Sequence, residues 1–202
     1  MANHVNTYVY FESISDAGKQ KLEQLYTRIR KDTSYSWFGD MWVDGEEGSP
    51  SYEETEKYDW TTKVIGPKWS YLEDYGDDFM SLTSAWSAPL DGIDWVVQQI
   101  AEVDPNVIAR VTYEDEFPNF FGAALYTADG QYDIEEWDDG ELRTMLLEEH
   151  PEMAEHWDED EEECDDEYWD MYQEHCWEKV NDVQNDAIVD MLKCIEDEKE
   201  MD

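Results

Sequence analysis

The hydrophobic pattern of this chain changes once, near residue 138, and this change limits the folds that the chain can adopt. Before it, short runs of β-branched and aromatic residues alternate with two segments of helical periodicity; after it, the periodicity is helical only. A length of 202 residues suffices for one ordinary domain with an extension, or for two small domains. We expect a folded α+β domain over residues 1–137 and an acidic helical extension over residues 138–202.

The first part of the chain predicts the element order β-α-β-β-α-β followed by a hairpin. Strands are expected where β-branched and aromatic residues cluster, and helices where apolar residues recur every three or four positions. The predicted strands cover residues 5–11, 60–65, 79–86, 107–113, 120–127 and 132–137, and the predicted helices cover residues 16–30 and 91–103. This order is typical of a ferredoxin-like split β-α-β antiparallel sheet with two helices.

Residues 32–59 interrupt this pattern with Gly, Ser, Pro and acidic residues among scattered aromatics. We interpret them as a long, partly ordered insertion, and an insertion of this length suggests a function. Tight turns are predicted at Gly66-Pro67 and at Asp129-Gly130.

Five short motifs stand out in the first part of the chain: Asn3-His4, Ile65–Trp69, Ser84–Pro89, Tyr113-Glu114 and Gly122. They resemble motifs of the YubB-type ferredoxin-like family of plasmid and bacteriophage proteins, although Ile65 and Pro67 depart from the usual family turn. The resemblance covers residues 1–137 and implies a ferredoxin-like α+β fold and a mobile-element origin. It implies no catalytic residue. Trp69 and Trp86 are expected in the core, and Gly66 and Gly122 are expected to meet backbone requirements.

The charge of the chain limits its partners. There are 54 Asp and Glu residues against 13 Lys and Arg residues, which gives a formal net charge of −41. Direct binding of nucleic acid needs a basic footprint, and an anionic membrane repels such a chain. The 10 Trp, 13 Tyr and 6 Phe residues argue against wholesale disorder. We therefore expect a basic partner, such as a protein surface that normally holds nucleic acid, or metal cations.

The N-terminal residues, the lengths of the apolar stretches and the cysteines predict the cellular location. The first residues carry no secretory signal pattern, and no apolar stretch approaches the roughly 18 residues that a membrane span requires. The three cysteines, Cys164, Cys176 and Cys194, fit reduced thiols better than a disulfide framework. We expect a protein of the host bacterial cytoplasm that does not bind membranes.

The last part of the chain predicts a short helix over residues 141–149, a break at Pro151, and a long helix from near Asp160 to near Glu198. About 38 helical residues would span roughly 57 Å. The apolar stripe of the long helix is predicted from spacings of three and four residues. Its members are Cys164, Tyr168, Tyr172, Cys176, Val180, Val183, Ala187, Met191 and Cys194 or Ile195.

Acidic residues form a second series on the same predicted helix, offset from the apolar stripe. Its members, each four residues apart, are Asp166, Asp170, Glu174, Glu178, Asp182, Asp186 and Asp190. Successive members rise roughly 6 Å, close to the spacing of phosphates along one nucleic-acid strand. Like charges at this spacing repel by a few tenths of a kcal/mol per pair, which solubility alone does not require. A solvated face of biased composition is the alternative interpretation.

The candidate partner-binding residues include this acidic series and its neighbours. Trp169 and Trp177, with Trp157, are candidate apolar anchors, although core packing is the commoner role of Trp. The preceding acidic run adds Asp158, Glu159, Asp160, Glu161, Glu162 and Glu163.

Catalytic and metal sites find little support in the sequence. His4, His150, His156 and His175 lack catalytic spacing, and no nucleophile elbow or phosphate-binding loop occurs. Cys164, Cys176, His175 and His156 do not have the spacing of a zinc site. The run from Asp158 to Glu163 lacks the Gly and the alternation of a calcium loop. We expect no enzyme, no cofactor and no specific metal site.

Three functions remain open from the sequence. We favour a non-enzymatic inhibitor, encoded by a phage or plasmid, that mimics nucleic-acid charge and blocks a bacterial defence protein or another nucleic-acid-binding host protein. The alternative is an interaction or assembly module, including a homo-oligomer, built through the long amphipathic helix with acidity serving solubility. A divalent-cation buffer is the third.

Overall fold

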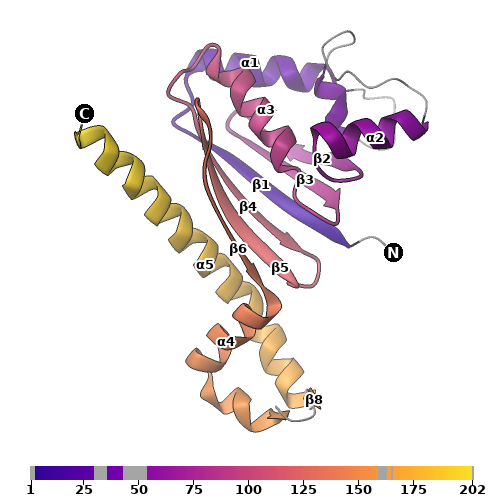
Figure 1. Ribbon diagram of the computed structural model, residues 1–202, viewed down its shortest axis with the longest axis vertical. Helices are drawn as coiled ribbons and strands as arrows, with labels where there is room; N and C mark the ends of the chain where they lie inside the picture. The colour runs from indigo at the N-terminus through magenta and orange to yellow at the C-terminus, as the bar shows by residue number, and fades with distance from the viewer. Residues whose placement is uncertain (1–2, 30–35, 43–53, 159–162, 165, 202) are drawn as a thin grey trace.

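The computed structural model describes residues 3–29, 36–42, 54–158, 163–164 and 166–201, and shows an α+β protein (Figure 1). At its centre lies an antiparallel six-stranded sheet with the strand order β2-β3-β1-β4-β5-β6. The strands are β1 (His4–Glu12), β2 (Ser70–Tyr75), β3 (Phe79–Ala85), β4 (Ile108–Asp115), β5 (Phe120–Thr127) and β6 (Gly130–Asp138). The predicted α+β class with a long C-terminal helix is therefore confirmed.

Helices α1 (Asp16–Thr27) and α3 (Leu90–Ala101) cover one face of the sheet (Figure 1). Helix α1 begins after Ser15, whose hydroxyl accepts a hydrogen bond from the Gly18 N–H at 3.2 Å. Both helices bury apolar residues at spacings of three and four, as an amphipathic helix on a core does. These two predicted helices are confirmed.

Strand β5 is buried on both faces, which distinguishes it from the other strands. Ala124 and Tyr126 pack into the core under α1 and α3, whereas Ala123 and Leu125 pack against the long helix α5 (Asp166–Met201). Residues that alternate along a strand point to opposite faces, so β5 contributes to both layers. Helix α5 thus covers the second face of the sheet over β5 (Figure 1).

Between β6 and α5 the chain leaves the sheet, at the bottom of Figure 1. It forms helix α4 (Asp139–Glu149), the 3₁₀ helix η2 (Pro151–His156) and a short hairpin of β7 (Trp157–Asp158) and β8 (Glu163–Cys164). Leu142, Leu146 and Met153 from this segment pack with Tyr168 and Val180 of α5.

The second predicted strand was wrong. Residues 60–65 are not a strand: they belong to helix α2 (Glu54–Val64) and the turn after it. The Trp60 ring contacts Trp37 and Trp42 edge-on, at centroid distances of 5.8 and 5.4 Å. This tertiary contact outweighs the local strand preference of the β-branched residues. The edge strand that pairs with β3 on the side away from β1 is instead β2, which the sequence analysis missed.

Two parts of the predicted insertion are described: residues 54–59 form the start of α2, and residues 36–42 pack into the core. The latter part holds the 3₁₀ helix η1 (Phe38–Met41), and Trp42 stacks on Trp95 of α3 at a centroid distance of 4.0 Å. The rest of the insertion up to residue 53 lies outside the described residues.

Three predictions about individual positions also need correction. The long helix begins at Asp166 rather than near Asp160, and Cys164 lies in β8, where it pairs with Trp157 of β7 in an antiparallel bridge. Of the two alternatives at the end of the apolar stripe, Ile195 is buried and continues the stripe, whereas Cys194 is exposed. Trp86 is 60% exposed at the end of β3, with a positive φ of 73°, so it is not a core residue.

The two turns are confirmed, since Gly66 and Gly130 both have positive φ angles that suit glycine. No helix in the described ranges is long and apolar enough to cross a membrane.

Candidate functional site: the acidic face of α5 and the adjoining groove

Helix α5 is held on the sheet by two apolar clusters with a polar contact between them. Towards its N-terminus, Tyr168 and Val180 pack with Phe121 and α4; towards its C-terminus, Met191 and Ile195 pack with β5. Between these clusters the Gln184 side chain is 3% exposed. Its amide N–H group donates to the carbonyl oxygens of Tyr113 at 2.9 Å and Gly122 at 3.1 Å. The predicted apolar stripe is therefore buried within the chain from Tyr168 onward.

The seven acidic residues predicted on this helix all lie in α5 and are all exposed. We call this set the acidic face; its members are Asp166, Asp170, Glu174, Glu178, Asp182, Asp186 and Asp190. In the described part of the chain, Asp190 is the one member that forms an ion pair, with Lys193 at 2.8 Å. Helix α5 as a whole contains 12 Asp and Glu residues and 3 Lys residues. Most of these carboxylates are consequently available to a partner.

Trp169 and Trp177 lie on the surface, contrary to the expectation that core packing is their commoner role. They are 50% and 41% exposed, although large aromatic residues usually bury most of their area. Asp166 and Glu174 precede them by three residues each, a spacing that places side chains next to each other on a helix. The structure therefore brings the predicted aromatic anchors and the predicted acids onto adjoining strips of α5.

A groove with a volume of about 740 Å³ adjoins the acidic face. Three parts of the chain line it: the turn between β4 and β5, the first turn of α4, and the N-terminal half of α5. Phe117 on that turn is 68% exposed and lines the groove together with Trp169 and Trp177. We call this the aromatic groove. The sequence analysis missed Phe117, although an apolar aromatic residue beside Pro118 in a predicted turn was a signal for an exposed ring.

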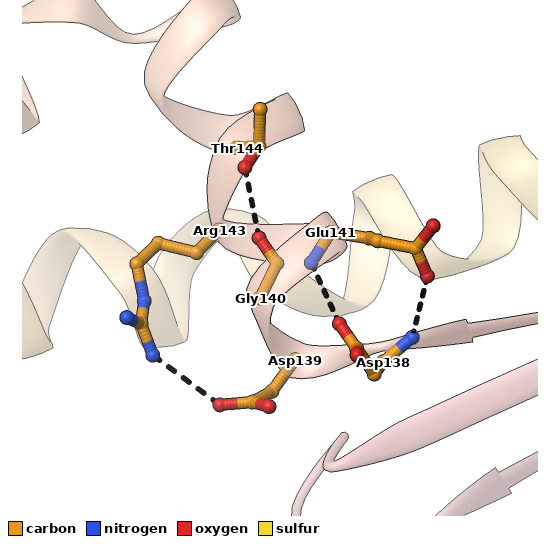
Figure 2. Close-up of polar contacts among 6 residues, drawn as sticks. All are labelled: Asp138, Asp139, Gly140, Glu141, Arg143 and Thr144. Carbon is orange, nitrogen blue, oxygen red and sulfur yellow. Dashed lines mark hydrogen bonds and ion pairs between the residues drawn. The ribbon is translucent and has the colours of Figure 1, made fainter.

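The start of α4 lines the aromatic groove, and polar contacts fix its first turn. Figure 2 shows these contacts. Asp138 accepts a hydrogen bond from the Glu141 N–H at 2.9 Å, and the Glu141 carboxylate accepts one from the Asp138 N–H at 3.0 Å. This reciprocal capping box fixes the first turn of the helix. Arg143 then pairs with Asp139 at 3.2 Å, and both line the groove.

The turn that carries Phe117 is also held firmly. The buried Asp115 carboxylate accepts hydrogen bonds from the N–H groups of Phe117 at 3.0 Å and Asn119 at 3.1 Å. It also accepts hydrogen bonds from the side-chain amides of Asn119 at 2.6 Å and Asn3 at 3.1 Å. Asp115 therefore determines where the Phe117 backbone lies relative to α5.

The remaining predicted site residues are only partly described. Asp158 and Glu163 lie in the β7–β8 hairpin, and residues 159–162, which include Glu159, Asp160, Glu161 and Glu162, lie outside the described residues. Among the described side chains, no group of three His, Cys, Asp or Glu residues is placed to hold a metal ion. His175 instead stacks on His150, with ring centroids 3.9 Å apart.

The five short motifs noted in the sequence come together at one end of the sheet. The starts of β1 and β5 and the ends of β3 and β4 meet there, because neighbouring strands are antiparallel. The His4 ring contacts Trp69 edge-on with centroids 5.4 Å apart, and the Trp86 N–H donates to the Asn3 carbonyl at 3.1 Å. The aromatic groove begins at this same end.

Glu114 lies between this end of the sheet and α5. Burial raises the pKa of its carboxyl group to about 7, and hydrogen bonding to Gln184 partly opposes the effect by favouring the charged form. Burial, followed by the charge of Glu114, also raises the pKa of Tyr8 on the neighbouring strand. An ionisable group therefore sits where the long helix docks.

Comparisons of the chain with family models, with curated proteins and with solved structures gave no match.

Proposed function

We propose that this protein is a non-enzymatic inhibitor whose acidic face occupies the nucleic-acid-binding surface of a basic host protein. One observation carries the proposal: α5 buries its apolar stripe within its own chain and leaves all seven acids of the acidic face in solvent. One side of the helix thus packs on the sheet, and the other side presents a row of negative charges to solvent.

The mechanism needs no bond to be made or broken. Carboxylates of the acidic face would pair with the Lys and Arg side chains that normally contact phosphates, and nucleic acid would be excluded by competition. The row from Asp166 to Asp190 extends about 36 Å along the helix. Opposite charges over such a distance accelerate encounter and make binding sensitive to salt.

The packing of α5 favours this proposal over the assembly alternative. Assembly through the amphipathic helix requires its apolar stripe to be accessible, yet Tyr168 and Val180 are each 1% exposed. Helix–helix association through these residues would require α5 to leave the sheet and expose Phe121, Ala123 and Leu125.

The context of the proposal is a ferredoxin-like domain from a mobile genetic element. The order β2-β3-β1-β4, with β1 between β3 and β4 and both helices on one face, supports a ferredoxin-like unit that β5 and β6 extend. The gathering of the family-like motifs at one sheet end supports the same origin. A bacterial defence protein or nucleic-acid enzyme is then the natural target.

The test compares two variants with the same net charge. In the first, the seven residues of the acidic face become Asn or Gln. In the second, seven exposed acids elsewhere are changed in the same way, namely Glu23, Glu73, Asp77, Asp129, Glu135, Glu148 and Glu155. Each immobilised protein is used to capture proteins from nuclease-treated bacterial lysate, with elution in rising salt or by added duplex DNA.

We expect the unaltered protein and the second variant to retain a nucleic-acid-binding protein that moderate salt or DNA releases. The first variant should lose it by at least tenfold. Equal retention by the two variants would show that the position of the charges is irrelevant, and the proposal would fail. Capture that DNA does not displace would also contradict it.

A further inference from the structure

The aromatic groove contains three exposed rings, those of Phe117, Trp169 and Trp177, and local contacts restrict Trp169 and the turn that carries Phe117. Trp169 contacts Tyr172 edge-on at 5.7 Å and Tyr168 at 5.9 Å between ring centroids, which restricts the Trp169 ring. The turn that carries Phe117 is fixed through Asp115. Aromatic surfaces that are already ordered lose little conformational entropy when a partner binds.

Carboxylates surround these rings. Glu116 lines the groove on the side of the β4–β5 turn and is exposed, while Asp139 on the α4 side is paired with Arg143. On the α5 side, Asp166, Asp170 and Glu174 precede Trp169, Gln173 and Trp177 by three residues each. Apolar rings bordered by negative charge on two sides are complementary to a side chain that is both cationic and flat.

Arginine fits this description better than lysine does. A guanidinium group is planar, stacks on aromatic faces and forms paired hydrogen bonds with a carboxylate, whereas an ammonium group is a compact and strongly hydrated charge. The chain itself contains this arrangement at another position. Arg110 lies over the Tyr10 ring at 4.7 Å from its centroid and pairs with Glu12 at 2.9 Å.

We propose that the aromatic groove binds arginine side chains of the basic partner against the rings of Phe117, Trp169 and Trp177, with the carboxylates of Glu116 and Glu174 at its rim. The acidic face supplies charge-dependent attraction, and the groove supplies discrimination between arginine-rich and lysine-rich surfaces. This inference rests on the proposed function, since it specifies which cations the acidic partner site selects.

The test uses two fluorescently labelled peptides, one of nine arginines and one of nine lysines, titrated with the full chain at fixed salt. Both peptides carry the same charge, so attraction by the acidic face alone treats them alike. We expect the arginine peptide to bind about three- to tenfold more tightly, the range that stacking on aromatic rings supports. Both affinities should fall steeply as salt rises.

A double variant, Trp169→Leu with Trp177→Leu, tests whether the groove is the origin of this preference. Its affinity for the arginine peptide should drop to that for the lysine peptide, which itself should stay unchanged. The matched control, Trp86→Leu with Tyr8→Leu, removes two other exposed rings and should keep the preference. Circular dichroism of each variant checks that α5 is still folded.

The outcomes separate the inference from the function on which it rests. Equal, salt-sensitive binding of both peptides by the unaltered protein would overturn the arginine preference and leave charge mimicry intact. If the double variant still prefers the arginine peptide, the preference does not arise in the aromatic groove, and the inference is overturned. Failure of either peptide to bind in a salt-sensitive way would contradict the proposed function itself.

Discussion

The two faces of the central sheet are covered in different ways. On the face under α1 and α3, 26 buried residues form one continuous core. On the face under α5, two separate clusters contain 7 and 6 buried residues, and Gln184 lies between them. Beyond α5 this second face leaves Tyr8, Tyr10 and Phe79 exposed. A large core specifies the fold, whereas a helix attached at two small clusters keeps most of its circumference free for a partner.

The largest expected loss of stability comes from truncating one leucine in each of the two layers, which compares how strongly each layer is packed. Leu82 lies in the large core and Leu142 in the cluster beneath α5, and both are completely buried. Leu82→Ala should lower the free energy of unfolding by about 3–4 kcal/mol, because the large core cannot collapse around the cavity. Leu142→Ala should cost about 2 kcal/mol, because fewer neighbours surround it.

Urea denaturation measures both losses, and hydrogen exchange shows where they act. Leu142→Ala should accelerate exchange in α4 and the N-terminal half of α5 while β1 and β3 stay protected. If both variants instead accelerate exchange uniformly over the chain, the two layers form one cooperative unit and the comparison breaks.

An intermediate effect is expected from removing the polar contact between the two clusters. Gln184→Ala deletes the donor to the Tyr113 and Gly122 carbonyls at a buried position. We expect a loss of about 1–3 kcal/mol in the free energy of unfolding, because buried carbonyl groups lose a hydrogen bond. The neighbouring Asn185→Ala changes an exposed amide and should alter stability by less than about 0.5 kcal/mol. Equal effects of the two substitutions would show that Gln184 does not anchor the helix.

The smallest effect is a pH dependence at Glu114. Because burial raises its pKa from 4.5 to about 7, the folded state binds this proton more tightly than the unfolded state. The stabilisation is complete below about pH 4.5 and is lost as pH rises towards 7. Glu114→Gln should therefore be more stable than the unaltered protein by about 1–2 kcal/mol at pH 8, with little difference at pH 4.5.

The control for this experiment is Glu116→Gln, which removes the same charge at an exposed position. Urea midpoints at pH 4.5, 6 and 8 give the comparison. A gap between the Glu114 and Glu116 variants that stays constant with pH would rule out titration of Glu114 as its cause.

The elements that the sequence predicted well have long, regular patterns. The stripe from Tyr168 to Ile195 keeps its spacing over most of α5, and the seven acids keep theirs, so both faces followed from the helical period. The error at residues 60–65 arose in a short segment rich in β-branched residues, too short for its periodicity to distinguish helix from strand. In the folded protein, the contacts of Trp60 with Trp37 and Trp42 favour a helix at this position.

The sequence of strand β5 also indicated burial on both faces, which the sequence analysis did not infer. Its residues from Phe121 to Tyr126 are almost all apolar and do not alternate, which is typical of a strand covered on both faces. Gln184 provided another such indication, since a polar residue at a buried position of a helix needs partners. Neither pattern indicates which element covers the second face of β5 or which groups bond to Gln184.

The sequence by itself determined that this chain is α+β, that it is a polyanion, and that its last helix has one apolar and one acidic face, because these properties depend on composition and on local period. Only the tertiary structure decided that β5 lies between two layers and that Trp169 and Trp177 are exposed. It alone also placed Phe117 in the same groove as these two residues. The physical reason is that the exposure of a side chain depends on which distant segments pack over it, and local spacing contains no information about those contacts.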